Sequence, residues 1–276
     1  MLAFNQLLAA GHIDPAGVRL VRHRDPDRSR HRRIFDAARA GDVRFQEYQE
    51  VQNSSQTVAA FREAKHLAGF VVDPTTDETV FMGLWARVGE RSAPVQDPFG
   101  SPGKPTWVVF ATQRLEAFDE YRGRLVIEWG EGTRAWVQRA DLQDKRILEI
   151  RRHNEDPAFP GFSAFRRGLD EIGSLPSSWA EVLRNACGVY LLVHRASGDQ
   201  YVGSAYGAGG FYGRWANYAD GHGGNVAMKE LGAPAEAYDV NVLEVLGSGA
   251  ADEDVFARES LWKEKLGTRA RGLNWN

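Results

Sequence analysis

Between Phe70 and Ile150 the chain repeats one kind of segment, a short run rich in β-branched and aromatic residues that ends at glycine, proline or aspartate. Such runs are typical of strands, and the residues that end them are typical of turns. We therefore expect an antiparallel β-sheet or a small barrel here. Most of the aromatic side chains should belong to the core, while one or two could line a concave surface. The runs are FVVDP, TVFMGLWARVG, TWVVFAT, RLVIEWG, RAWVQRA and RILEIRR, and their aromatic residues include Phe81, Trp85, Trp107, Phe110, Trp129 and Trp136.

Helical periodicity precedes these runs. From Ile34 to about Phe70, apolar residues recur every three to four positions, and this spacing predicts helices. The densest basic segment, from Arg19 to Arg33, lies just before them and holds seven arginines, two histidines and two acidic residues. It is either a solvated loop or a local patch that binds a polyanion.

A looser, proline-containing stretch follows the β-rich runs. We predict a domain boundary between Asp170 and Pro176, which gives a first domain of residues 1–175 and a second of residues 176–276. A chain of 276 residues is long enough for two separate cores, because single cores seldom grow beyond this size.

The last third begins with two strand-like runs, GVYLLVH and QYVGS, joined by the polar turn ASGD. Each run holds a tyrosine close to a glycine. Downstream, FYGRWANYADG has helical spacing, YDVNVLEVL is typical of a third strand, and DEDVFARESLWKEKLG is an amphipathic helix. This mixture predicts an α+β fold. The two tyrosines either pack on a half-buried sheet or form the floor of an active site.

The order of residues in this last third resembles the GIY-YIG endonuclease superfamily. The two strand motifs are present as Gly188-Val189-Tyr190 and Tyr201-Val202-Gly203, separated by a ten-residue spacer. An arginine on the first helix, a glutamate on a later helix and an asparagine close behind it follow in the family's order; they are Arg214, Glu259 and Asn274. The resemblance covers residues 188–276 and implies a three-stranded antiparallel sheet with flanking helices.

The resemblance also implies a chemistry, the hydrolysis of phosphodiester bonds in DNA. Glu259 would be the ligand of Mg²⁺ or Mn²⁺, because such hard cations take one or two carboxylates and keep several waters. Arg214 would offer a two-pronged donor to the scissile phosphate. Tyr190 would act as the base for the attacking water, provided that a cation lowers its pKa from about 10. Tyr201 would orient the phosphate, and Asn274 would hold the site together.

Three further residues are weaker candidates. Members of the family commonly carry a histidine or tyrosine after the first helix, which here is Tyr218 or His222. Tyr218 follows Arg214 by four residues, so both side chains share one helix face. His222 lies in a glycine-rich turn and is as easily a solvated residue. Lys229 is a possible phosphate contact. Glu259 also has a plain alternative, an ion pair with Lys263 four residues later.

Residues 1–175 show no resemblance and are expected to choose the DNA. They could recognise an unmodified sequence, or read a modified base that is flipped into an aromatic pocket. They could instead bind a protein that delivers the nuclease to a repair or defence assembly. Arginines set in an aromatic β scaffold favour DNA, with Arg28, Arg30, Arg32 and Arg33 as contacts, and a modification-dependent restriction enzyme is the preferred hypothesis. A homing or repair nuclease and an inactive regulatory module remain as alternatives.

Composition limits the classes that fit. The 34 basic and 37 acidic residues give a net charge of −3, and only 8 of the basic and 11 of the acidic residues lie in residues 188–276. Neither part is therefore a non-specific nucleic-acid coat. Cys187 is the single cysteine, which excludes an intramolecular disulfide and a cysteine zinc site. With no apolar stretch long enough for a membrane and no basic start of a signal peptide, a cytoplasmic protein is expected. Cutting both strands would need a homodimer or two successive nicks.

Overall fold

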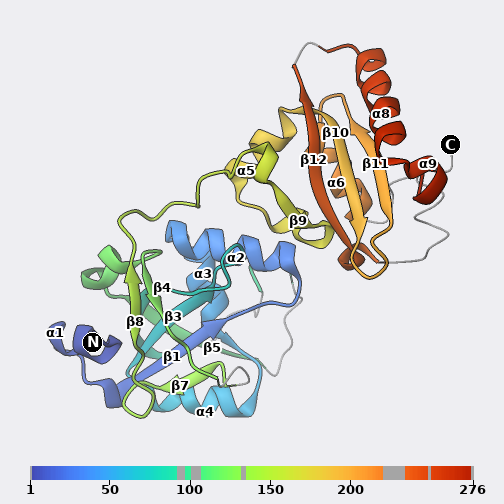
Figure 1. The fold of residues 1–276 in the computed structure, drawn as a ribbon. Helices are drawn as coiled ribbons and strands as arrows, with labels where there is room; N and C mark the ends of the chain where they lie inside the picture. Colours follow the sequence, from blue (N-terminus) through green and yellow to red (C-terminus); the bar gives the residue numbers. More distant parts are fainter. Residues whose placement is uncertain are drawn as a thin grey trace. The chain divides into compact units, whose positions relative to one another are not determined.

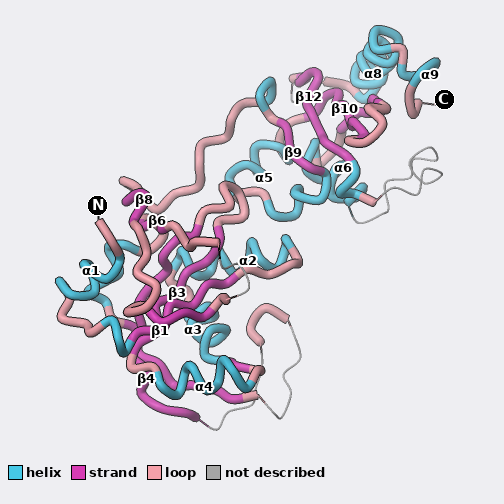
Figure 2. Tube along the Cα trace, turned by 60° about the horizontal axis from the view of Figure 1, so that its bottom comes forward, coloured by secondary structure: helices cyan, strands magenta, loops and turns pink. Residues whose placement is uncertain are grey.

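The computed structural model describes residues 2–91, 97–100, 107–131, 135–219, 234–247 and 250–274. The chain divides into two compact units, Met1–Glu155 and Asp156–Asn276, each of which mixes helices and strands (Figures 1 and 2). None of the described helices is both long and apolar enough to cross a membrane.

Where the strands that the β-rich runs form in the first unit pair with one another, they are antiparallel, as predicted. Strand β1, which precedes these runs, is parallel to β3 and makes the sheet mixed. Its described strands run in the order β2-β5-β4-β3-β1-β7, with β6 paired to β4 and β8. Strands β1 and β3 are parallel, because the helices between them carry the chain back across the sheet. The strands are β1 (Val18–His23), β2 (Val51–Gln52), β3 (His66–Val72), β4 (Thr79–Arg91), β5 (Val108–Arg114), β6 (Leu125–Ile127), β7 (Val137–Arg139) and β8 (Ile147–Ile150).

Three of the four described α-helices of the first unit, α2, α3 and α4, begin at side-chain caps. Asp27 accepts a hydrogen bond from the backbone of Arg30 at 2.9 Å and starts α2, and Ser54 does the same for α4. The predicted helical stretch ends earlier than expected, because residues 66–72 form β3. The helices are α1 (Phe4–Ala10), α2 (Arg28–Ala40), α3 (Val43–Glu50) and α4 (Ser55–Glu63), with short 3₁₀ turns at Pro15–Gly17 and Glu116–Tyr121.

Four of the six aromatic side chains from the β-rich runs are buried in this unit's core, as predicted. Trp107 and Trp136 are the half-buried exceptions, and both line a cavity. The buried four are Phe81, Trp85, Phe110 and Trp129.

The second unit has a sheet of order β11-β10-β12-β9, so a fourth strand joins the three that were expected. This strand, β9 (Arg166–Gly168), pairs with β12 (Tyr238–Leu246). Its neighbour Phe165 is buried in the second unit's core with Trp215 stacked on it, the ring centroids 5.5 Å apart. The boundary therefore lies at residue 155, before the Asp170–Pro176 stretch that the sequence indicates, since aromatic residues of the looser stretch belong to the second core.

Helices flank this sheet, and in Figure 1 α6 crosses behind it. The acidic first turn and lysine-containing last turn of α8 match the helix dipole. The remaining elements are α5 (Ser177–Arg184), β10 (Cys187–His194), β11 (Gln200–Ala205), α6 (Gly210–Ala219), α8 (Asp252–Leu266) and α9 (Thr268–Arg271), with 3₁₀ turns at Phe162–Ala164, Leu169–Ser174 and Ala235–Ala237.

Candidate active site

The hairpin of β10 and β11 places Tyr190 directly opposite Gly203. A Cβ atom at Gly203 would lie 2.4 Å from the Tyr190 hydroxyl oxygen and 2.9 Å from the Tyr201 ring. Both distances are shorter than real Cβ contacts, so only glycine lets the two rings lie against this part of β11. Steric contact with the two tyrosine rings thus explains why the second strand motif has glycine at position 203.

The glycine of the first motif has a different reason. Gly188 has φ of +150°, and a Cβ there would meet the carbonyl oxygen of Glu244 at 2.0 Å. The pairing of β10 with β12 shifts register between Val189 and Tyr190. This bulge and the glycine before it set the position at which the Tyr190 side chain leaves the strand.

Helix α6 brings two more polar groups to Tyr190. The Tyr190 hydroxyl donates a hydrogen bond to the Tyr218 hydroxyl at 3.1 Å, and Arg214 Nε donates to the Tyr190 oxygen at 3.4 Å. The guanidinium carbon of Arg214 lies 5.1 Å from the centre of the Tyr218 ring, as expected for residues four apart on one helix face. The Tyr201 ring lies 6.4 Å from that of Tyr218. We call Tyr190, Tyr201, Tyr218 and Arg214 the tyrosine–arginine cluster.

Arg214 is half-buried, and no carboxylate among the described residues forms an ion pair with it. A buried cation normally has a counter-charge, because removing it from water is costly. Its neighbours here are three phenol groups, which are neutral at physiological pH. The cluster is therefore suited to an external anion, and a phosphate fits the donor geometry of a guanidinium.

Burial governs the ionisation of the tyrosines. It raises the pKa of Tyr190 well above the ordinary value of 10, with Tyr218 and Tyr201 adding to the shift and Arg214 opposing it. The pKa of Tyr201 is raised as well, by burial and then by Tyr218 and Glu259. A general base near neutral pH needs a lowered tyrosine pKa, so the charge of Arg214 alone does not prepare Tyr190 for that role.

Glu259 on α8 is within electrostatic range of Tyr201 and is held by two neighbours. Its Oε1 pairs with Lys263 Nζ at 2.8 Å, which is the predicted ion pair, and its Oε2 accepts a hydrogen bond from the Ser204 hydroxyl. In the described part of the chain no group of three metal-ligating side chains occurs. A lone carboxylate still fits Mg²⁺, which completes its shell with water and phosphate oxygens.

Asn274 forms hydrogen bonds with the edge of β11 that faces away from β10. Its Oδ1 accepts from Val202 N at 2.9 Å, and its Nδ2 donates to Val202 O at 2.8 Å. The side chain is 1% exposed. Asn274 thus continues the ladder of β11 at the residue between Tyr201 and Gly203.

The structure separates the weaker candidates. Tyr218 belongs to the tyrosine–arginine cluster, whereas His222 and Lys229 lie outside the described residues. Sequence reasoning missed Ser204, which directly follows the second strand motif. The sequence shows a hydroxyl residue at this position, but it does not show that α8, which carries Glu259, packs against it.

Two of the four arginines predicted to contact DNA are engaged within the first unit. Arg30 forms ion pairs with Asp25 and Asp97, and Arg32 is 4% exposed and pairs with Asp36 at 2.8 Å. Arg28 and Arg33 are exposed on α2. The segment from Arg19 to Arg33 is not a loop, since it forms β1 and the start of α2.

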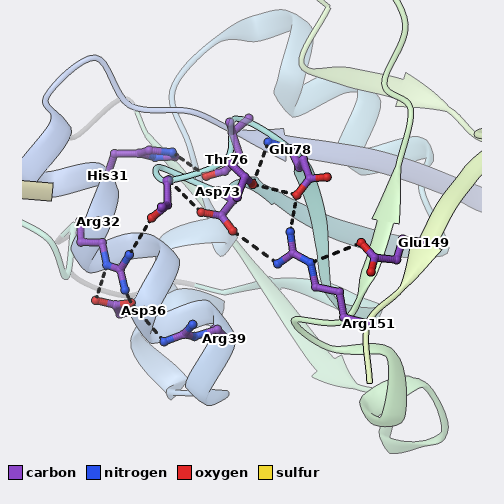
Figure 3. Close-up of polar contacts among 11 residues, drawn as sticks. His31, Arg32, Asp36, Arg39, Asp73, Thr76, Glu78, Glu149 and Arg151 are labelled. Carbon is purple, nitrogen blue, oxygen red and sulfur yellow. Dashed lines mark hydrogen bonds and ion pairs between the residues drawn. The ribbon is translucent and has the colours of Figure 1, made fainter. Parts of the chain in front are cut away.

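A further arginine of the first unit, Arg151 just after β8, is paired in the same way. Figure 3 shows Arg151 among Asp73, Glu78 and Glu149. Arg151 reaches Asp73 at 3.4 Å and Glu149 at 3.9 Å, and it also donates to Glu78. These contacts fasten the β3–β4 turn to the end of β8. Arg151 therefore stabilises the fold of the first unit, and its charge is compensated there.

Comparison with known proteins adds little to this site. No protein-family model matches the chain, and a search of curated proteins found no match. Among solved structures, a mutant catalytic domain of the intron endonuclease I-TevI is similar, at 19% identity over 33% of this chain and 94% of that domain, with a TM-score of 0.28. A likeness of that size supports no argument, so the case for a function rests on the site itself.

Proposed function

We propose that the chain is a Mg²⁺-dependent DNA endonuclease whose second unit, residues 156–276, hydrolyses phosphodiester bonds. The observation that carries this proposal is the half-buried Arg214, which faces tyrosine hydroxyls and has no carboxylate partner among the described residues. A half-buried cation without a counter-charge among the described residues is suited to an external anion, and phosphodiester is the anionic group of DNA. The order of residues that resembles GIY-YIG endonucleases supports the choice of reaction.

The tyrosine–arginine cluster binds and orients the phosphate. Arg214 places its donor fork against the non-bridging oxygens, where charge grows as the water attacks. The Tyr190 hydroxyl, already bonded to Tyr218 and Arg214, fixes the direction of the guanidinium. Burial of these groups lowers the local dielectric and strengthens their interaction with the phosphate.

Glu259 would hold the metal ion, with Ser204 and Lys263 fixing the direction of its carboxylate. A bound Mg²⁺ would supply Lewis-acid stabilisation and a more acidic water. Tyr190 can act as a base only as its phenolate, because the neutral hydroxyl must first give up its own proton to solvent. The positive charges of Arg214 and of the metal ion would favour that ionisation against burial, and the phenolate oxygen would then take the proton of the attacking water.

A restriction-type role, in which the first unit selects a target that carries a modified base, completes the proposal. The second unit has fewer basic than acidic residues, so it gains little from counterion release when it binds DNA alone. Selection and most of the affinity are therefore assigned to residues 1–155.

One observation favours a second candidate, a DNA-binding regulatory module without catalysis. Lys263 lies 2.8 Å from the carboxylate that would hold the metal, and its charge competes with a cation for the same oxygen. In that case the unit binds DNA through Arg214 but cleaves nothing.

Nicking of supercoiled plasmid by the full chain separates these candidates. The nuclease proposal predicts open-circular product with Mg²⁺ or Mn²⁺ and none with EDTA. Glu259→Gln should abolish nicking while DNA binding persists, because an amide is a poor Mg²⁺ ligand of nearly the same shape. Glu264→Gln, an exposed position on the same helix, is the matched control and should nick normally. Binding without nicking by the wild-type protein favours the regulatory module.

A further inference from the structure

The first unit contains a cavity of about 630 Å³ at the end of β1, and this volume lies within the ~300–1,000 Å³ range of small-molecule sites. Its lining comes from the turn after β1, the start of α2, the end of α3 and strand β2. The described lining residues all belong to the first unit, whereas the tyrosine–arginine cluster belongs to the second.

Aromatic side chains form part of its wall. Trp107 and Trp136 are half-buried, so each retains exposed ring surface toward the cavity that it lines. His23 and Tyr48 also line the cavity, and the His23 ring is 5.2 Å from that of Tyr48 and 6.2 Å from that of Trp136, with interplanar angles of 53° and 51°. Trp136 is thus tilted against His23 rather than stacked on it. The exposed ring surface of Trp107 or Trp136 can take a planar ligand.

The charged side chains of the lining nearly balance. Arg22, Arg24 and Arg30 stand against Asp25 and Asp97, and Arg30 is paired with both aspartates. Burial lowers the pKa of His23 to about 4, which keeps its imidazole neutral near pH 7. Such a lining suits a neutral polar ligand better than a phosphate or a carboxylate.

Hydrogen-bonding groups remain for that ligand. Gln52 donates its Nε2 to the carbonyl of Gln49 at 2.8 Å, and within the described part of the chain its Oε1 has no donor. Asn53 is exposed beside it. An amide oxygen and an amide group next to aromatic rings match the donor and acceptor edge of a nucleobase.

A cation stands next to these groups. Arg24 also lines the cavity and is largely exposed, with a surface ion pair to Asp77 at 3.0 Å. An exposed pair of this kind is weak, so Arg24 can exchange its partner for a backbone phosphate. The base and its flanking phosphate would then contact adjacent residues.

We propose that this cavity receives one nucleobase turned out of the DNA double helix, stacked against Trp107 or Trp136 and contacted along its polar edge by Gln52 and Asn53. The inference rests on the proposed function in one respect, that DNA is the substrate. It adds the cavity in which the base is read and names the side chains that contact it.

The test blocks the cavity without removing a buried contact. Asn53→Trp places a large side chain in the lining from an exposed position, and Gln56→Trp places the same side chain at an exposed position of α4 outside it. The full chain is titrated with labelled duplex fragments made with cytosine, 5-methylcytosine or 5-hydroxymethylcytosine. All titrations contain EDTA, so cleavage plays no part.

The expected result is a loss of affinity of tenfold or more for Asn53→Trp on the best-bound fragment, and unchanged affinity for Gln56→Trp. Kethoxal, which modifies guanine whose Watson–Crick edge is free, should detect the unpaired guanine opposite the flipped base with the wild-type protein and not with Asn53→Trp. Equal affinity of Asn53→Trp and wild type overturns the inference, whether or not the protein nicks plasmid. Cavity-dependent binding without nicking leaves the inference standing and overturns the nuclease proposal. Failure to bind any fragment contradicts both.

Discussion

The side-chain amide of Asn274 forms two hydrogen bonds with the backbone of Val202: its Oδ1 accepts from the Val202 N–H at 2.9 Å, and its Nδ2 donates to the Val202 carbonyl at 2.8 Å. Val202 separates Tyr201 from Gly203, so the amide fixes the strand at the point where the tyrosines meet. Because both partners are buried, neither backbone group can turn to water if the amide is removed.

Asn274→Ala should therefore destabilise the second unit by about 2–4 kcal/mol, since two buried backbone groups lose their partners. The measurement is urea unfolding of the full chain, followed by a probe in the second unit. Asn185→Ala is the matched control, because Asn185 is exposed at the end of α5. Equal stability of the two variants would show that β11 does not depend on this amide.

Tyr190→Phe removes the hydroxyl that connects Tyr218 and Arg214 and keeps the ring. The change should lower the nicking rate by about 10² or more if the hydroxyl handles or orients the water, while stability falls by only about 1 kcal/mol. Tyr238→Phe is the control, since its hydroxyl is buried without a hydrogen-bond partner in the described structure. Parental rates in Tyr190→Phe would make this tyrosine a packing residue.

Gly203→Ala tests the steric reason for the second strand motif. The added methyl group would meet the Tyr190 hydroxyl, so the ring must shift, at a cost of about 1–3 kcal/mol and with loss of nicking. Gly213→Ala lies in α6 with nothing within 4 Å of the new Cβ and should stabilise by about 0.5–1 kcal/mol. Thermal unfolding and plasmid nicking measure both effects. A fully active Gly203→Ala would contradict the close approach of Tyr190 to β11.

Alkaline pH should weaken the second unit. Unfolded tyrosines ionise near pH 10, whereas burial raises the pKa of Tyr190 and Tyr201 in the folded protein. Above pH 10 the tyrosines therefore ionise in the unfolded state before they do so in the folded state, which favours unfolding. The free energy of unfolding should fall by about 1.4 kcal/mol per pH unit for each such tyrosine. Urea unfolding between pH 8 and 11 measures this slope. Tyr190→Phe should reduce it and Tyr206→Phe, at an exposed position, should not.

Local patterns explain why much of the second unit could be predicted from the sequence. The strand runs alternate over short distances, so the hairpin was placed within one residue of β10 and β11. The four-residue spacing of Arg214 and Tyr218, and that of Glu259 and Lys263, decides which groups share a helix face. Each of these relationships depends on neighbouring residues only.

What the sequence could not predict depends on residues that are distant along the chain. Arg30 pairs with Asp97 and Arg151 with Asp73, so charges that look available in the sequence are compensated by partners some 70 positions away. The parallel pairing of β1 with β3 likewise requires the helices between them to fold back. Ser204 acquires its contact with Glu259 in the same way.

Arg214 gives the most direct test of the proposed nuclease, because that proposal depends on its guanidinium binding phosphate. The measurement is the initial rate of Mg²⁺-dependent plasmid nicking by full-length Arg214→Ala, beside Arg214→Lys and the control Arg166→Ala. Arg166 is a surface residue that pairs with Asp239 on β12. DNA binding in EDTA is measured for each variant.

The account predicts that Arg214→Ala loses several orders of magnitude in rate, because transition-state charge goes unstabilised. Arg214→Lys should recover little, since an ammonium cannot reproduce the planar fork, and Arg166→Ala should nick like the wild type. A rate for Arg214→Ala within a few-fold of the wild type would contradict the account.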